Sequence, residues 1–190
     1  MTIRFATLLA ALALGSAACA QSAEAPAKTD VDRYGAAIDS DSGPAKPRRQ
    51  TMPCKVIRIT DGDGIVCNRI GRVRLIGIDA PELNQRPFGP QAAAALGRMI
   101  PVGAEVQLEP DVEGRDRYGR QLAYIWSESR MVNWRMVRDG WAVLLTHPPN
   151  VQYAETFARA ERLAREGSQG LWGIGGFECR PAEHRARRCD

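Results

Sequence analysis

The sequence lacks several features that would assign it at once to a class of protein. Its 190 residues contain no apolar run long enough to cross a hydrocarbon layer of about 30 Å as a permanent helix, since the run from Phe5 through Leu14 is too short. The cysteines show no C-x-x-C spacing, and His147 and His184 have no cysteine or acidic partner at ligand spacing. A zinc site is therefore not expected. Nor is there an internal repeat.

What the sequence does contain is the balance of an ordinary folded domain. Hydrophobic residues make up 44% of the chain and charged residues 25%, which is enough to bury a core. The formal net charge of +4 favours anionic partners such as nucleic acid or acidic lipid. Many basic proteins bind neither, so the charge alone does not assign a function.

The amino terminus predicts an exported protein. Residues 1–20 carry one charge, Arg4, followed by the apolar run and by small residues that end in Ala18-Cys19-Ala20. This arrangement is typical of a secretory signal peptide, and we expect cleavage after Ala20 into the periplasm or the medium. The alternative is lipid anchoring through Cys19, because the residues before it loosely resemble a lipobox.

Removal of that segment leaves four cysteines, Cys54, Cys67, Cys179 and Cys189. An even number in an exported chain predicts two disulfides. We expect the pairs Cys54–Cys67 and Cys179–Cys189. The first pair flanks a predicted hairpin almost symmetrically about Asp61, so antiparallel strands would bring the two cysteines across from each other.

Composition and periodicity divide the rest of the chain. Residues 21–50, rich in Ala, Pro, Ser and Asp, predict a disordered linker. A folded domain is expected over 51–177 and a basic, solvated tail over 178–190. Within the domain we predict strands over 54–60, 64–69, 73–78, 105–108, 122–126 and 141–145. Helices are predicted over 89–100, 131–139 and 153–165. This order indicates an α+β domain built on a small β-barrel.

Three clusters of charged residues stand out in the domain. They are the turn Asp61-Gly62-Asp63-Gly64, the segment from Arg74 to Glu82, and the basic turn from Arg115 to Arg120. Taken singly, each has a plain structural interpretation, because Asp and Gly are good turn formers and basic loops are commonly solvated. The first cluster is not an EF-hand loop. That pattern needs an oxygen-bearing side chain where Ile65 stands and a glutamate where Arg72 stands.

The second cluster has an arginine in a predicted strand and two carboxylates just beyond it. Arg74 and Asp79 are five positions apart, so strict alternation along a strand would turn them to opposite faces. If they share a site, the chain must bulge or bend between them, and Gly77 is the expected position.

Together the clusters meet the chemical requirements for cleaving a phosphodiester. Such a reaction needs stabilisation of extra negative charge on a five-coordinate phosphorus and a positioned water. Two carboxylates offer the oxygen ligands that hold Ca²⁺ against a phosphate. Two guanidiniums can bind phosphate oxygens through paired hydrogen bonds, and a further carboxylate can serve the water.

The three motifs, in this order, resemble the staphylococcal nuclease family. They are Asp-Gly-Asp at 61–63, R-L-x-G-I-D-A-P-E from Arg74, and D-R-Y-G-R-x-L-A-Y from Asp116. The resemblance extends from about Cys54 to Phe177. It implies an OB-type five-stranded β-barrel with three helices, which agrees with the expected order of elements.

The resemblance also implies a calcium site. By it, Asp63 and Asp79 are carboxylate ligands of Ca²⁺, and Ala80 contributes its main-chain carbonyl. Gly64 stands where the family usually has threonine, and Ala80 where threonine is frequent. Because Ala80 would contribute only main chain, neither departure removes a functional side chain.

For catalysis, the resemblance assigns Glu82 to the water and Arg74 and Arg120 to the phosphate. Arg117 and Tyr118 are the expected contacts to the sugar or base. The activity implied is phosphodiester hydrolysis with 3′-phosphate products. Because nothing in the motifs demands a missing 2′-OH, we expect both DNA and RNA as substrates. We also expect a monomer without a stable protein partner.

Two other classes of function remain open at this point. One is a catalytically silent OB-fold module that binds single-stranded nucleic acid. It is disfavoured because degenerate copies usually lose the charged positions, all of which are present here. The other is a surface lipoprotein with a structural role, which rests on Cys19 alone and leaves the three motifs unexplained.

Overall fold

The computed structural model describes residues 30–31, 37–38 and 43–189. The predicted signal peptide and most of the predicted linker lie outside these residues. Two short strands, β1 (Asp30–Val31) and β2 (Ala37–Ile38), pair antiparallel ahead of the main body. Within the described part of the chain, no helix is both long and apolar enough to cross a membrane.

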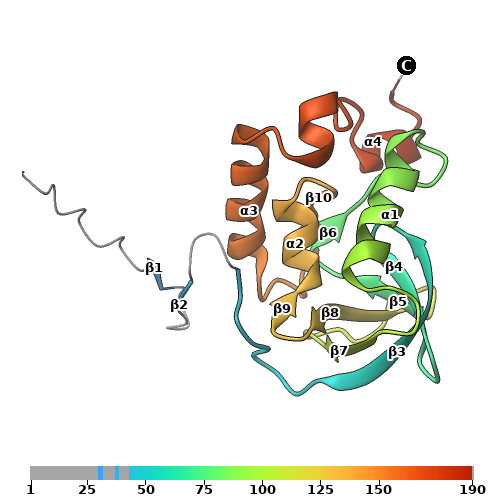
Figure 1. Cartoon of the computed structure of the whole chain (residues 1–190), viewed down its shortest axis with the longest axis vertical. Helices are drawn as coiled ribbons and strands as arrows, with labels where there is room; N and C mark the ends of the chain where they lie inside the picture. The colour runs from blue at the N-terminus through green and yellow to red at the C-terminus, as the bar shows by residue number, and fades with distance from the viewer. Residues whose placement is uncertain (1–29, 32–36, 39–42, 190) are drawn as a thin grey trace, which may run out of the picture.

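The main body is a five-stranded barrel (Figure 1). Its strands are β3 (Met52–Asp61), β4 (Gly64–Cys67), β5 (Gly71–Leu75), β7 (Glu105–Glu109) and β8 (Gln121–Ser127). They pair antiparallel in the order β5-β4-β3-β7-β8, and a parallel pairing of β5 with β8 closes the barrel. A short strand, β9 (Arg130–Met131), pairs antiparallel with the end of β8. Alternating apolar residues of these strands fill the interior, as expected for strands with one buried face.

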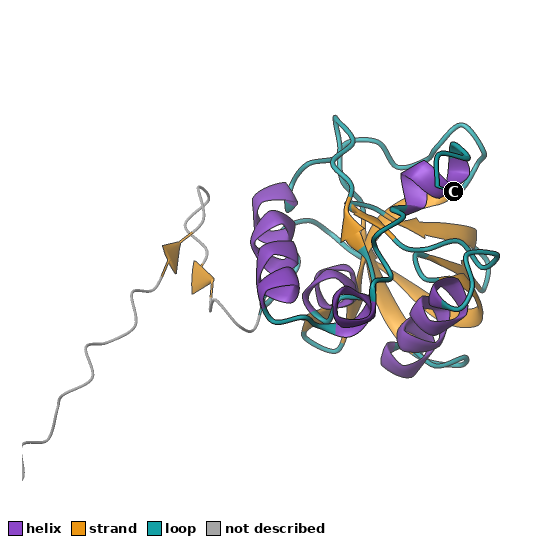
Figure 2. Cartoon of the chain, turned by 90° about the horizontal axis from the view of Figure 1, so that it is seen from above, coloured by secondary structure: helices purple, strands orange, loops and turns teal. Residues whose placement is uncertain are grey.

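Three helices cover one side of the barrel, and Figure 2 shows them from above. They are α1 (Phe88–Met99), α2 (Val132–Arg138) and α3 (Ala154–Glu166). Each buries an apolar face: α1 buries Ala92 and Leu96, and α3 buries Phe157 and Ala160. The predicted α+β fold with a five-stranded barrel and three main helices is therefore confirmed.

After α3 the chain forms two short helices, of which the second lies where a solvated tail was expected. A 3₁₀ helix, η1 (Gly170–Ile174), packs its buried Leu171 with Val143 and Phe177 in a small hydrophobic cluster. A short helix, α4 (Pro181–Arg185), follows inside the region predicted to be a solvated tail. It lies apart from the three main helices (Figure 2).

Two boundaries also differ from those predicted. The strand expected over 73–78 is interrupted, and β6 (Ile78–Asp79) pairs antiparallel with β10 (Val143–Leu144) outside the barrel. Residues 43–50, assigned to the linker, lie against the barrel. The backbone N–H groups of Arg48 and Arg49 donate to Glu109 Oε1 at 2.8 and 3.0 Å. Glu109 is fully buried, so these bonds help to satisfy a carboxylate that cannot reach water.

Both predicted disulfides are confirmed. Cys54–Cys67 joins β3 to β4 with a Cα–Cα distance of 5.6 Å, and Cys179–Cys189 closes the C-terminal segment around α4. Both sulfurs of the first pair lie in the core, at 3% and 2% exposure for Cys54 and Cys67. That bridge ties the open end of the hairpin whose turn carries Asp63.

Replacing Cys54 and Cys67 together with alanine is expected to lower the free energy of unfolding by about 3 kcal/mol, because a loop of about 15 residues is then no longer closed in the unfolded chain. Denaturant titration of the variant measures this difference. The matched control is the double alanine variant of Cys179 and Cys189, which opens a C-terminal loop of mostly exposed residues. Loop closure alone predicts a similar loss there, because the two sequence separations are 13 and 10. An unchanged free energy of unfolding in the Cys54 and Cys67 variant would contradict the stabilising role of the hairpin bridge.

Candidate active site

A bend at Gly77 brings Arg74 and Asp79 onto the same side of the chain, as predicted. Gly77 has φ +82°, in the left-handed region, and a Cβ there would overlap the ring of Phe157. The buried side chain of Asn133 holds the bend through hydrogen bonds. Its Nδ2 donates to the carbonyl of Ile76 at 2.9 Å, and its Oδ1 accepts from the N–H of Ile125 in β8. The bend is thus tied to the barrel wall.

Arg74 lies at the centre of the site. Its Nη1 is 2.7 Å from Asp63 Oδ2, and its Nη2 is 3.4 Å from Asp79 Oδ1. The same guanidinium donates to the carbonyls of Leu75 and Ile78 at 3.1 and 3.0 Å. It is therefore oriented both by the backbone of the bend and by the two carboxylates.

The two carboxylates bound by Arg74 are buried. Asp63 is 8% exposed and Asp79 is 2% exposed. Burial raises the pKa of Asp63 to about 7, against the opposing effect of Arg74 and of the hydrogen bond from the backbone of Ala80. That hydrogen bond, from Ala80 N to Asp63 Oδ2, is 2.8 Å long and links the turn of the hairpin to the segment after β6. Three predicted metal-site residues are thus neighbours.

Glu82 lies in the connection between β6 and α1, where it is partly exposed. This connection packs closely against Gly89 in the first turn of α1. A Cβ at Gly89 would overlap the carbonyl oxygen of Glu82, and the N–H of Gly89 donates to the carbonyl of Gln85 at 2.8 Å. The start of the helix and the backbone of Glu82 are therefore in direct contact.

The basic turn from Arg115 to Arg120 lines the same cavity as these residues. Arg120 Nε is 2.6 Å from Asp116 Oδ2, and Asp116 Oδ1 accepts the backbone N–H groups of Tyr118 and Arg120. Partial burial raises the pKa of Asp116, but these hydrogen bonds outweigh it, and the pKa is lowered overall. The Tyr118 ring is exposed, with the guanidinium carbons of Arg117 and Arg120 at 4.9 and 5.6 Å from its centroid.

One open cavity of about 790 Å³ joins these groups. The predicted site residues that line it are Asp63, Arg74, Asp79, Glu82, Arg117, Tyr118 and Arg120. Leu145 and His147 also line it. The structure thus brings together every predicted catalytic and substrate-binding side chain, with Ala80 attached through its hydrogen bond to Asp63.

Sequence reasoning missed one residue of the site, Arg185 in α4. Its Nη1 and Nη2 lie 3.0 and 2.8 Å from the two oxygens of Asp79, and Nη1 is 2.8 Å from Glu82 Oε1. The hydrogen bonds with Asp79 raise the pKa of this guanidinium above its ordinary value, so it is a permanent cation. The signal that could have found Arg185 is the group of arginines between Cys179 and Cys189, because a disulfide there holds them in a compact loop.

The residues present fit a divalent cation with oxygen ligands. Asp63 and Asp79 are buried carboxylates at the mouth of an open cavity, and both are compensated by guanidiniums. Among the described residues, no group of three His, Cys, Asp or Glu side chains is already arranged to hold a metal ion. Positive charge is supplied instead by Arg74 and Arg185. Carboxylate and carbonyl oxygens without nitrogen or sulfur ligands favour Ca²⁺ or Mg²⁺ over transition metals.

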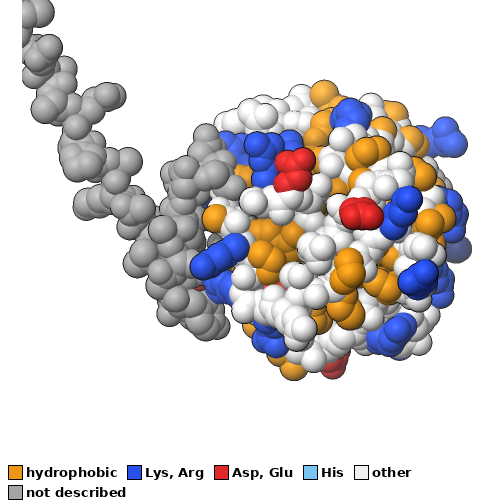
Figure 3. Space-filling model, turned by 60° about the horizontal axis from the view of Figure 1, so that its bottom comes forward, with side chains coloured by type: hydrophobic (Ala, Val, Ile, Leu, Met, Phe, Trp, Pro, Cys, Tyr) orange, Lys and Arg blue, Asp and Glu red, His pale blue; other side chains and the backbone are white. Residues whose placement is uncertain are grey.

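The basic charge of the protein is not confined to this site. On the face shown in Figure 3, Lys and Arg side chains are dispersed among apolar and acidic ones. That face therefore presents no single basic track.

Comparison with known proteins identifies the family. The family described as staphylococcal nuclease homologue matches residues 72–173, more than half of the chain. The chain is 32% identical over 145 residues to a thermonuclease of Staphylococcus hyicus, which covers 70% of this chain and 85% of that protein. It is 35% identical over 125 residues to a thermonuclease of Staphylococcus intermedius, covering 62% of this chain and 74% of that protein. An uncharacterized endonuclease of Haemophilus influenzae is 34% identical over 131 residues, with 65% and 68% covered. Since the family match covers more than half of the chain, including the three main helices and the segment from Arg74 to Arg120, the chain belongs to the staphylococcal nuclease family.

Proposed function

We propose that this protein is a calcium-dependent nuclease that hydrolyses phosphodiester bonds of both DNA and RNA and leaves 3′-phosphates. The observation that carries the proposal is the convergence of Asp63, Asp79, Arg74, Glu82 and Arg120 on one open cavity. Both the family and the chemistry of these side chains support it. Nothing around the cavity demands a particular sugar, so we infer that both nucleic acids are substrates.

The two arginines would bind the scissile phosphate. Arg74 lines the cavity, and contacts with the backbone of the bend hold its guanidinium there. Arg120 is held by Asp116 on the other side of the cavity. Planar guanidiniums bind phosphate oxygens in pairs, and negative charge that develops on the phosphorus would therefore be stabilised from two directions.

Glu82 would position and deprotonate the attacking water. Its carboxylate lines the cavity and is partly exposed, so a water can reach it. Asp63 and Asp79, with the carbonyl of Ala80, would hold the calcium ion. When bound, Ca²⁺ would supply charge stabilisation to the phosphate oxygens.

A silent module that binds single-stranded nucleic acid is the alternative, and it fits the site less well. Such modules depend on a basic groove with aromatic side chains on which bases stack. Among the residues that line this cavity, Tyr118 is the one Phe, Tyr or Trp side chain. Buried carboxylates beside the arginines would repel the backbone of a ligand that is merely bound. Their retention is explained by catalysis.

We also infer that the enzyme works outside the cytoplasm as a monomer. Two disulfides in the described residues suit an oxidising compartment. Residues 1–20 would be removed on export, 21–50 would serve largely as a linker, and 51–177 would form the catalytic domain, followed by the segment 178–190. Amino-terminal sequencing of the exported protein tests the cleavage after Ala20. An acylated Cys19 would instead identify a lipoprotein.

Hydrolysis is expected to require calcium and to be abolished by chelation, because the site offers oxygen ligands alone. The purified chain from Gln21 to Asp190 is incubated with single-stranded DNA or RNA, with calcium chloride or with an excess of chelator. We expect both substrates to be cut with calcium and neither to be cut with chelator. The ends of the products are identified by their resistance to, or removal by, a 3′-phosphatase.

The control for this experiment is the Asp79→Asn variant at the same calcium concentrations. It keeps the size of the side chain and removes the charge of the most buried proposed ligand. We expect it to need a higher calcium concentration for the same rate. Activity that survives full chelation would exclude the metal assignment, and binding without cleavage in any condition would favour the silent module.

A further inference from the structure

The described C-terminal segment places a guanidinium on the carboxylates proposed to bind metal. Arg185 contacts both oxygens of Asp79 at 3.0 and 2.8 Å and Glu82 Oε1 at 2.8 Å. It lies 106 residues along the chain from Asp79 and 103 from Glu82, so no local turn brings them together. A paired hydrogen bond between a guanidinium and a carboxylate is among the stronger polar contacts in proteins.

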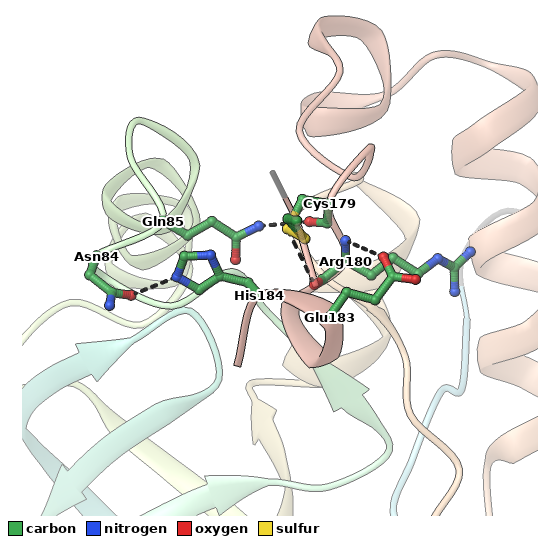
Figure 4. The surroundings of a disulfide bond; sticks show 7 residues. Asn84, Gln85, Cys179, Arg180, Glu183 and His184 are labelled. Atoms are coloured by element: carbon green, nitrogen blue, oxygen red, sulfur yellow. Dashed lines mark hydrogen bonds between the residues drawn. A yellow bond between two sulfur atoms is a disulfide. The ribbon is translucent and has the colours of Figure 1, made fainter. Parts of the chain in front are cut away.

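The segment that carries Arg185 is anchored at several points. Cys179 and Cys189 close it into a loop around α4. Gln85 Nε2 donates to the carbonyl of Cys179 at 2.7 Å, and His184 Nε2 lies 3.2 Å from Asn84 Oδ1 (Figure 4). Asn84 and Gln85 belong to the same connection as Glu82. The loop therefore docks directly on the segment that carries the proposed catalytic glutamate.

Docking of this kind raises the effective concentration of Arg185 at the site. A free cation in solution competes with a guanidinium that is always close by, since the disulfide and the contacts of Asn84 and Gln85 hold the loop in place. A divalent cation bound to Asp79 needs at least one of the two oxygens that Arg185 now contacts. The cation and the guanidinium also repel each other. The two cannot occupy their full sets of contacts at once.

We propose that the loop closed by Cys179–Cys189 is a built-in cap of the carboxylate site, in which Arg185 holds the place of the divalent cation and competes with it. The inference rests on the proposed function, because it takes Asp79 to be a metal ligand. Arg185 thereby sets the cation concentration at which the site fills. The disulfide links that threshold to the integrity of the loop.

Calcium binding in the absence of nucleic acid tests the cap. Isothermal titration with calcium chloride is performed on the full exported chain and on its Arg185→Gln variant. We expect the dissociation constant for calcium to fall about tenfold in the variant, since a paired contact is lost but its guanidinium side chain is 43% exposed and partly screened by solvent. Arg188→Gln is the matched control, because Arg188 lies on the same loop with an exposed side chain. Its calcium affinity should equal that of the unmodified protein.

The loop itself is tested by the Cys179→Ser, Cys189→Ser double variant. Opening the disulfide should tighten calcium binding in the same direction as Arg185→Gln, because the guanidinium is then held less closely. Calcium should also speed amide hydrogen exchange over 181–188 in the unmodified protein, because binding displaces Arg185. A calcium affinity unchanged by opening the disulfide would overturn the proposal that the closed loop acts as the cap.

The outcomes separate the cap from the proposed function. Equal calcium affinity in the unmodified protein and Arg185→Gln overturns the cap and leaves calcium-dependent hydrolysis standing. If Arg185 instead binds substrate phosphate, Arg185→Gln raises KM for nucleic acid without tightening calcium binding, and the cap is again overturned. If neither protein binds calcium, the metal site itself is wrong, and the cap fails with it.

Discussion

Replacement of Glu82 by glutamine is expected to lower kcat by about 10²-fold or more. Glutamine keeps the size of the side chain but cannot accept a proton from water, so the loss is in the chemical step. Arg74→Lys and Arg120→Lys are expected to have effects of similar size, because a preorganised charge stabiliser is lost in each case. Lysine presents a single ammonium group and cannot reproduce the planar pair of donors with which Arg74 meets its partners. Steady-state kinetics on a defined oligonucleotide with saturating calcium measures these effects.

Two control variants make the result specific to the site. Arg58→Lys changes an exposed arginine of β3, and Glu178→Gln an exposed glutamate near the C-terminus. Both should retain normal kcat. Thermal unfolding of all five variants shows whether the fold is kept. Near-normal turnover in Glu82→Gln, Arg74→Lys and Arg120→Lys would mean that the chemistry occurs elsewhere.

Replacement of Gly89 by alanine is expected to reduce activity by about 10²-fold although no functional side chain is altered. The added Cβ would overlap the carbonyl oxygen of Glu82, and the atoms nearest to it belong to the backbone of Glu82 and Leu83. Backbone cannot turn away as a flexible side chain can, so the connection that carries Glu82 must move. A displacement of about 1 Å at a catalytic group can cost about 10²-fold in rate.

Gly97→Ala is the matched control, since it makes the same change in the same helix. A Cβ at Gly97 would meet Ile59 Cγ1 at 3.8 Å, an ordinary contact. Alanine is favoured over glycine within helices by about 1 kcal/mol, so this variant should be as active as the unmodified protein and no less stable. Equal activity in Gly89→Ala and Gly97→Ala would show that the position of Glu82 does not depend on the start of α1.

Much of the domain could be predicted because its signals are local. Alternating apolar residues and the Asp-Gly turn indicate the hairpin of β3 and β4, and a helical period with Gly167 after it indicates α3. The bend at Gly77 could be anticipated from a conflict, since strand alternation would separate Arg74 from Asp79. The pairing of Cys54 with Cys67 followed from the symmetry of the hairpin. In each case, neighbours in the sequence suffice to limit the geometry.

The elements that were missed depend on partners far away in the chain. The hydrogen bonds of Arg48 and Arg49 to Glu109 span about sixty residues. The composition of a segment rich in Ala, Pro and Ser does not predict them. The break between β5 and β6 also depends on a distant partner, because β6 pairs with β10. A short pairing of this kind leaves no periodic pattern in either strand.

The sequence by itself determined the barrel, its covering helices, the two disulfides and the charged groups of the site. Only the tertiary structure decided that these charged groups share one cavity and that Arg185 joins them. A basic segment has the same composition whether it is solvated or docked. The C-terminal segment is docked by its disulfide and by contacts to Asn84, Gln85 and Asp79, about a hundred residues earlier. Those contacts exist only when the barrel and α1 have already brought the carboxylates and the connection after β6 to the same edge of the molecule.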